Sequence, residues 1–220
     1  MVKMSKKELV KRYAVFIVSL FVMAIGVAMT KKAELGVSPI SSVANVMSIQ
    51  FTSLSIGNWL IIWNCVLILG QILFLRKKFQ PVQLMQIPLS FLFGYFTDFG
   101  MWLMSFFDTD TYAVKMIFVI VGTVILGFGV ALSVIANVVM NFGEAFVKAV
   151  SDVTHKDFGN LKIGFDVSCV VVSVVLSLIF FKMKIVGTRE GTIMAALTTG
   201  ILVKLFSKLI RKPLEKVLVN

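Results

Sequence analysis

The stretch "GVAMTKKAELGVSPISS" (Gly26–Ser42) ends the first apolar run of the chain, and "GVALSVIANVVMNFGEA" (Gly129–Ala145) ends a later one. Both stretches begin with Gly-Val-Ala, and both have an alanine seven residues after the glycine, at an offset of 103 residues. In both, the apolar run then breaks and a segment with the pattern of a short helix begins. The two stretches predict one structural unit that is used twice.

The composition indicates an integral membrane protein. Hydrophobic residues make up 58% of the 220 residues and charged residues 15%, against about 45–50% and 25% in soluble domains. Because a spanning helix needs about 20 residues, we expect a single integral membrane domain over residues 1–220 with five or six spans. The two cysteines, Cys65 and Cys169, lie inside apolar runs, which argues against a disulfide framework or a thiolate metal site.

Six apolar segments predict an all-α, polytopic membrane helix bundle. The six predicted transmembrane helices are Tyr13–Thr30, Ile56–Leu75, Leu84–Phe107, Val114–Val139, Ile163–Phe181 and Thr192–Leu209. The third and sixth segments are the least apolar, since each carries a full charge, at Asp98 and at Lys204.

Two connections between these segments predict short amphipathic or re-entrant helices. In "SPISSVANVMSIQ", Ser38 can cap a helix N-terminus, and the proline after it suits the first turn. A second such helix would begin at Asn141, with Glu144 in its first turn. At membrane depth, irregular backbone around these helices is tolerated only where it packs in protein or lines a wet cavity.

The similarity extends over three segments in each half. With one residue dropped, "GNWLIIWN" (Gly57–Asn64) matches "GNLKIGFD" (Gly159–Asp166), and at an offset of 106 "FLFGYFTDF" matches "LTTGILVKL". Repeat 1 would cover about residues 13–107 and repeat 2 about residues 114–210. A unit with three crossings must be inverted in its second copy, as in many secondary transporters, whose sites lie near the midplane beside broken helices. The alternative is chance similarity between apolar helices.

The distribution of Lys and Arg predicts that both termini are cytoplasmic. With the N-terminus inside, six positive residues lie outside, at Lys31, Lys32, Lys115, Lys182, Lys184 and Arg189. Fifteen lie inside, at Lys3, Lys6, Lys7, Lys11, Arg12, Arg76, Lys77, Lys78, Lys148, Lys156, Lys162, Lys208, Arg211, Lys212 and Lys216. The net charge of +11 therefore indicates membrane orientation, and no nucleic-acid partner is expected.

Several motifs resemble a known family. The stretches "AELGVSP", "GNWLIIWN", "DFGNLKIGFD" and "VGTREGTIMAALTTG" are similar to those of the YczE/YyaS/YitT-like family of bacterial inner-membrane proteins, in particular the short YczE-type branch without a soluble C-terminal domain. The similarity covers nearly the whole chain. The resemblance implies a multi-pass protein of the bacterial plasma (inner) membrane, but it supplies no substrate and no catalytic residue.

Charged residues within spans are costly unless they are paired, hydrated or near the interface. Asp166 either pairs with Lys162 one turn earlier or forms a polar site with Asn64, its counterpart in the first repeat. Lys204 either extends to the interface or pairs with Asp98, its counterpart at the offset of 106. The ten candidate solute-binding residues are Ser38, Ser41, Asn45, Asn64, Asp98, Asn141, Glu144, Asp166, Arg189 and Lys204.

The motifs of common enzyme classes are not assembled in the sequence. "GTREGT" (Gly187–Thr192) suits a tight turn in which Arg189 can hold a carboxylate or phosphate, but it lacks the order of a P-loop. The single histidine, His155, lies in a polar segment, and no catalytic triad or metal cluster can be drawn. We expect no enzyme activity, no cofactor and no metal site.

Two functions fit these features. The first is a transporter or permease for a small polar or charged solute, which should gather Asn64, Asp98, Asp166 and the Ser38 helix around one cavity. The second is a non-transporting membrane protein that assists or regulates a membrane-associated complex, in which these residues would be scattered. The expected partners are the lipid bilayer, an unidentified small solute and, in a homo-oligomer, further copies of the chain.

Overall fold

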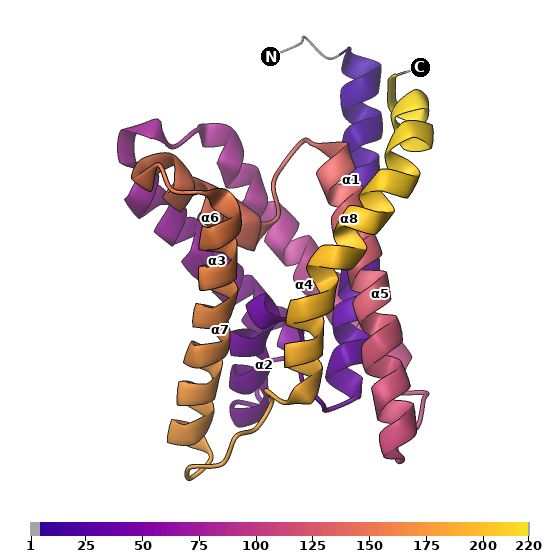
Figure 1. Ribbon diagram of the computed structural model, residues 1–220, viewed down its shortest axis with the longest axis vertical. Coiled ribbons are helices and arrows are strands. Elements are labelled where there is room, and N and C mark those ends of the chain that lie inside the picture. Colours follow the sequence, from indigo (N-terminus) through magenta and orange to yellow (C-terminus); the bar gives the residue numbers. More distant parts are fainter. Residues whose placement is uncertain (1–4, 220) are drawn as a thin grey trace.

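A computed structural model describes residues 5–219, so that Lys3 of the charge argument lies outside the described residues. The chain forms the helices α1 (Lys6–Lys32), α2 (Pro39–Gln50), α3 (Ile56–Leu75), α4 (Gln86–Met104), α5 (Tyr112–Ala136), α6 (Phe142–Thr154), α7 (Phe158–Phe180) and α8 (Glu190–Val219). Two short 3₁₀ helices, Arg76–Lys78 and Pro81–Met85, join α3 to α4. Figure 1 shows α1 beginning and α8 finishing at the same end of the bundle.

Five helices are long and apolar enough to cross a membrane: α1, α3, α5, α7 and α8. The remaining long helix, α4, contains Gln86, Thr97 and Asp98 within its 19 residues, and these polar side chains lower its mean hydropathy. The bundle therefore contains five of the six predicted spans by this measure. The order of one long, one short and two long helices occurs twice along the chain.

Helices α1 and α5 form the central pair, and glycines allow their close approach. A Cβ atom at Gly26 would lie 2.7 Å from the backbone oxygen of Gly122, and one at Gly129 would lie 2.8 Å from the backbone nitrogen of Met23. Small residues at such crossings let spanning helices pack through their backbones. Arg12, which is buried, donates to the carbonyl oxygens of residues 135 and 136 at 3.2 Å and so caps the last turn of α5.

The pair α3 and α4 is held at both ends. At one end Gly57 lies against Gly94, because a Cβ atom at Gly94 would lie 2.7 Å from the backbone oxygen of Gly57. At the other end the buried amides of Gln71 and Gln86 donate to one another at 3.1 Å. The reciprocal pair satisfies two polar groups that are costly to bury alone.

The short helices α2 and α6 lie toward opposite ends of the bundle, with α6 in the half that holds the chain ends (Figure 1). Their N-terminal turns meet, since a Cβ atom at Gly143 would lie 2.7 Å from the Ile40 side chain. Helix α2 packs against α7, where the Ser42 hydroxyl donates to the carbonyl of Cys169 at 3.3 Å. Helix α6 packs against α3, where Phe146 lies over Gly70.

Helices α7 and α8 are not packed on one another, and Figure 1 shows them on separate sides of α2. In α7 the buried residues are Cys169, which lies against Ser42 of α2, and Ser173 and Ser177, whose hydroxyls bond to the segment 184–188. Helix α8 packs on α5, with Leu202 over Gly127. Large apolar side chains are exposed along both helices, among them Val171, Ile179, Leu197 and Leu205, which suits contact with lipid.

Candidate functional site

A cavity of about 470 Å³ is here called the large vestibule. It lies where α1 ends, at the end of the bundle away from the chain ends, and the loop between α7 and α8 closes one side of it. Its polar lining consists of Thr30, Lys31, Lys32, Glu34, Asn45 and Arg189. Val37, Ile49, Met101, Ile185 and Val186 contribute apolar surface.

Two glycines shape the backbone around the large vestibule. Gly36 and Gly187 adopt φ angles of 107° and 80°, in the region that L-residues with side chains rarely occupy. The Asn45 amide donates to the carbonyl oxygen of Gly187 at 2.7 Å, and Gly191 N–H donates to the carbonyl of Leu35 at 2.8 Å. These two bonds hold the segment 185–191 against α2 and the end of α1.

The charges of the large vestibule are unevenly paired. Lys115 donates to Glu34 at 2.7 Å, and this hydrogen bond lowers the pKa of the Glu34 carboxyl. Arg189 forms an exposed ion pair with Glu190 at 3.2 Å. Within the described chain, Lys31 forms no ion pair, and its ammonium group donates to the Ser48 hydroxyl at 3.0 Å.

A smaller cavity, of about 190 Å³, is here called the small vestibule. It lies between the α3–α4 connection and the start of α6, and Gln80, Gln83, Gln86, residues 138–140, Ala145 and Lys148 line it. Lys148, its one charged lining residue, pairs with Asp152 at 2.5 Å.

Two of the ten candidate residues, Asn45 and Arg189, line the large vestibule, and none lines the small one. The Ser38 hydroxyl donates to Ser41 at 3.0 Å rather than capping α2. Asn141 precedes α6 and donates to the Ser133 hydroxyl at 2.9 Å. The expectation that Asn64, Asp98, Asp166 and the Ser38 helix surround one cavity is not met by either vestibule, because Asn45 of that helix lines the large one while Asn64, Asp98 and Asp166 line neither.

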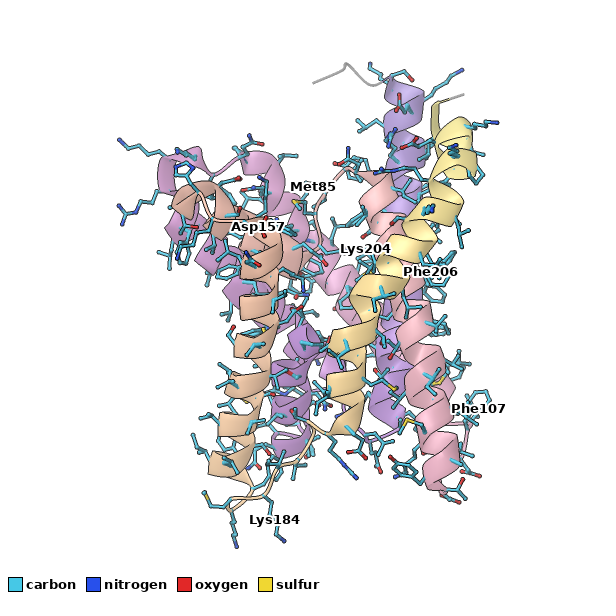
Figure 2. The ribbon with its side chains drawn as sticks, viewed as in Figure 1. Met85, Phe107, Asp157, Lys184, Lys204 and Phe206 are labelled. Carbon is cyan, nitrogen blue, oxygen red and sulfur yellow. The ribbon has the colours of Figure 1, made fainter. Side chains whose placement is uncertain are left out.

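Asp98 and Lys204 do not pair. One oxygen of Asp98 accepts from the Ser55 hydroxyl at 2.5 Å and the other from Gly57 N–H at 2.9 Å, so the carboxylate caps the start of α3. Lys204 is exposed on α8, in the half of the molecule that holds the chain ends (Figure 2). Asp98 lies toward the other end of the bundle, where α3 begins.

Three candidate residues lie along the inner faces of α3, α6 and α7. Asp166 pairs with Lys162 at 2.5 Å, as the spacing of four residues predicts. Glu144 is partly buried in the first turn of α6, and burial raises the pKa of its carboxyl. The side chain of Asn64 is buried in α3, and its amide nitrogen has no hydrogen-bond partner.

The lysines of the large vestibule were not predicted as site residues from the sequence. Lys31 and Lys32 follow the first apolar run, so their position is equally that of the flanking charges found at the ends of many spans. The only signal for a second role is the break in the helix shortly after them, at "ELGVSP". Among residues 5–219 no group of three or more His, Cys, Asp or Glu side chains could hold a metal ion.

Comparison with known proteins supports the resemblance seen in the sequence. The chain is 26% identical over 201 residues to "Uncharacterized membrane protein YczE" of Bacillus subtilis (strain 168), and the match covers 90% of this chain and 86% of the relative. No solved structure matches the chain. The chain is thus a YczE-like membrane protein. The family model described as "Family of unknown function (DUF6198)" matches residues 10–208, and the chain therefore belongs to this family.

Proposed function

We propose that the protein is a transporter for a small polar or charged solute, built from two inverted repeats that give access to a central site from each side of the membrane in turn. The observation that carries this proposal is the meeting of α2 and α6. Their N-terminal turns touch at Ile40 and Gly143, and each helix borders one vestibule, α2 the cavity of about 470 Å³ and α6 the cavity of about 190 Å³. Broken helices that meet between two entrances are typical of secondary transporters.

The helix ends support the inverted repeat. Helices α1 and α5 are both followed by a residue of positive φ, Glu34 at 58° and Asn137 at 49°, which are separated by the offset of 103. Arg76 and Lys182, with φ of 47° and 51°, follow α3 and α7 at the offset of 106. Outside glycine such conformations are uncommon, so their recurrence at the two offsets is independent of the residue types that suggested the repeat.

The helix contacts support it as well. Helix α4 packs on α1 as α8 packs on α5, and α2 packs on α7 as α6 packs on α3. In the central pair, Gly26 faces Gly122 and Leu126 of α5, and Gly129 faces Ser19 and Met23 of α1. Adding 103 to the residue number of Gly26 gives Gly129, and subtracting 103 from Gly122 and Leu126 gives Ser19 and Met23. The two contacts are therefore equivalent, as a two-fold axis between α1 and α5 requires.

We propose that the large vestibule opens to the outside and that both termini are cytoplasmic. The fifteen-to-six distribution of Lys and Arg supports this orientation. The difference in volume between the two vestibules then corresponds to an outward-facing state, in which the inner entrance is the narrower one.

Access to the centre tests the proposal. In a chain with Cys65→Ala and Cys169→Ala, a cysteine at Ile40 should react with a membrane-impermeant thiol reagent added on either side of oriented proteoliposomes. Alternating states would expose this position to each side in turn. Exposed positions give the sidedness controls, since Ser53→Cys should react only from the outside and Lys156→Cys only from the inside.

Reaction at Ile40 from one side only, or from neither, would contradict transport and favour the alternative of a protein that assists a membrane-associated complex. Reversed reactivity of the two control positions would overturn the proposed orientation while leaving the proposed mechanism intact.

A further inference from the structure

We infer that the large vestibule binds a small anion and that the ammonium group of Lys31 is its principal contact. That the anion is the transported solute rests on the proposed function. That the vestibule binds an anion follows from the charges of its lining alone.

The Lys31 ammonium group has a single hydrogen-bond partner within the described chain. An ammonium group has three N–H donors, and the one hydrogen bond that the structure gives it goes to the neutral Ser48 hydroxyl at 3.0 Å. The residue is partly buried and lines the cavity. A desolvated charge without a partner is costly, and ionisable residues in membrane-spanning helices commonly mark solute pathways.

No carboxylate of the described chain forms an ion pair with this ammonium group, although Glu34 lies near enough to attract it. Glu34, the one acidic residue in the lining, is exposed and bonded to Lys115 on α5. Arg189 is paired with Glu190, while Lys32 contributes a second ammonium group for which no ion pair is found in the described chain. The lining therefore carries an excess of positive charge, which a recessed cavity concentrates.

The size and the other lining groups suit a small ligand. A volume of about 470 Å³ falls within the roughly 300–1,000 Å³ of small-molecule sites. Thr30 and Asn45 add polar surface beside apolar Val37 and Ile49. The small vestibule offers no comparable site, because its lysine is already paired with Asp152.

The hydrogen bond to Ser48 distinguishes an anion-binding role of Lys31 from that of a lysine whose ammonium group only extends to the membrane interface. Ser48 is on α2, so the Lys31 side chain is directed across the cavity toward another helix. Lys184 gives the contrast, since it is exposed on the turn between α7 and α8, and Figure 2 shows it at the end of the bundle.

Melting curves of the purified protein in nanodiscs of phosphatidylcholine test the inference, with sulfate, inorganic phosphate and succinate as probes. We expect at least one probe to raise the melting temperature of the wild type with a saturating dose dependence. Lys31→Gln should weaken this response by about tenfold or more, equivalent to about 1.4 kcal/mol of binding free energy. Lys31→Arg should retain it, and Lys184→Gln, the matched control at the same end, should respond as the wild type does.

Because the probes change the ionic strength for all variants alike, the difference between Lys31→Gln and Lys184→Gln isolates the site. Without a probe, Lys31→Gln should melt no lower than the wild type, because it removes a charge that has no ion pair. A lower melting temperature of Lys31→Gln together with an unchanged response to the probes would mean that Lys31 has only a structural role, and would overturn the inference.

Stabilisation by phosphatidylglycerol nanodiscs but by no soluble probe would assign the site to a lipid headgroup and would also overturn the inference. Binding without two-sided access at Ile40 would contradict transport alone, and two-sided access without binding would contradict the anion site alone.

Discussion

Asp98 shows how one carboxylate can fix the start of a neighbouring helix. It accepts from Ser55 and from the backbone of Gly57 at the first turn of α3, where the helix dipole favours a negative charge. We expect Asp98→Ala to lower the free energy of unfolding by about 2 kcal/mol, because it removes charge-assisted hydrogen bonds and leaves their donors unpaired. For a chain of this length the melting temperature in detergent should fall by about 4–8 °C.

The control for this change is Asp108→Ala, which alters an exposed carboxylate in the next connection. Lys204→Met should change stability by no more than about 0.5 kcal/mol, as an exposed substitution does. The double variant Asp98→Ala with Lys204→Met should show additive losses. Rescue of one charge deletion by the other would instead show that the two residues interact.

Glu144 should make stability depend on pH. Burial raises the pKa of this carboxyl above its usual value of 4.5, against a smaller opposing effect of Lys162. The folded state therefore favours the protonated form, and the stability gained from that proton is lost as the pH rises through the raised pKa.

Melting temperatures between about pH 5 and pH 8 should fall more for the wild type than for Glu144→Gln, which cannot ionise. Asp152→Asn on the same helix removes a carboxylate that is exposed and paired with Lys148, and it serves as the control. Parallel curves for the wild type and Glu144→Gln would show that Glu144 does not govern the pH dependence.

For individual residues, contacts could be predicted from the sequence where the two partners lie close together on one helix. The ion pair of Lys162 and Asp166 follows from a spacing of four residues on one helix. The partners of Asp98 and the cavity beside Lys31 depend on the register between helices, which no local pattern specifies. Both residues could be recognised as charges near an apolar run, but their neighbours could not be named.

At the scale of helices, the largest difference between the two halves of the molecule concerns one helix pair. Helix α3 packs on α4, whereas their counterparts α7 and α8 do not pack together. The difference is visible in the glycines: Gly94 is pressed against Ile61 and the backbone of Gly57, while a Cβ atom at its counterpart Gly200 would meet nothing within 4 Å.

A leucine at these two positions should therefore have different effects, on stability at Gly94 and on labelling at Gly200. Gly94→Leu should lower the free energy of unfolding by at least about 3 kcal/mol and lower the folded yield, because the leucine side chain would clash with backbone atoms of Gly57, which cannot move aside. Gly200→Leu should fold and melt like the wild type, but it should abolish labelling of the cysteine at Ile40 from the inside. Size-exclusion yield and the labelling assay measure both effects, and normal two-sided labelling of Gly200→Leu would show that α8 does not close on α7.

Helix limits could be predicted to different degrees. The bounds of α3 agree with the segment Ile56–Leu75 because Ser55 caps its start and a run of basic residues follows its end. Helix α8 extends well beyond the predicted Leu209, through Pro213, to Val219. Its last turns lie beside α1, where Lys11 donates to the carbonyl of Val217 at 3.0 Å, and this tertiary contact is invisible to hydropathy.

For the whole molecule, the packing of α3 on α4 without a matching contact between α7 and α8 predicts a second conformation. If the repeats exchange their arrangements, α7 and α8 should meet as α3 and α4 do now, with Gly159 and Gly200 in the places of Gly57 and Gly94. Cysteines at residues 159 and 200, in the chain without its native cysteines, should then form a disulfide on mild oxidation, since the Cα atoms would come within the reach of about 4.4–6.8 Å.

The cross-linked protein should be closed from the outside and react at residue 40 only from the inside. Cysteines at Val171 and Ile193, exposed positions on the same two helices, give the control pair and should remain unlinked. Equal cross-linking of both pairs would indicate random collision of a mobile α8 rather than a defined second state.

The contacts of Gly26 and Gly129 in the central pair have a consequence for the chain itself. Each half brings its own first helix to that interface, and the segment between the halves, residues 105–111, contacts α1 at its last residue, where Thr109 donates to the carbonyl of Lys32 at 3.4 Å, away from the glycines of the α1–α5 crossing. The two halves are thus held together by the contacts between their helix faces and do not depend on the covalent link between them. A gene cut between α4 and α5 would encode two separate membrane polypeptides that carry complementary surfaces for one another, each with the basic residues that orient it.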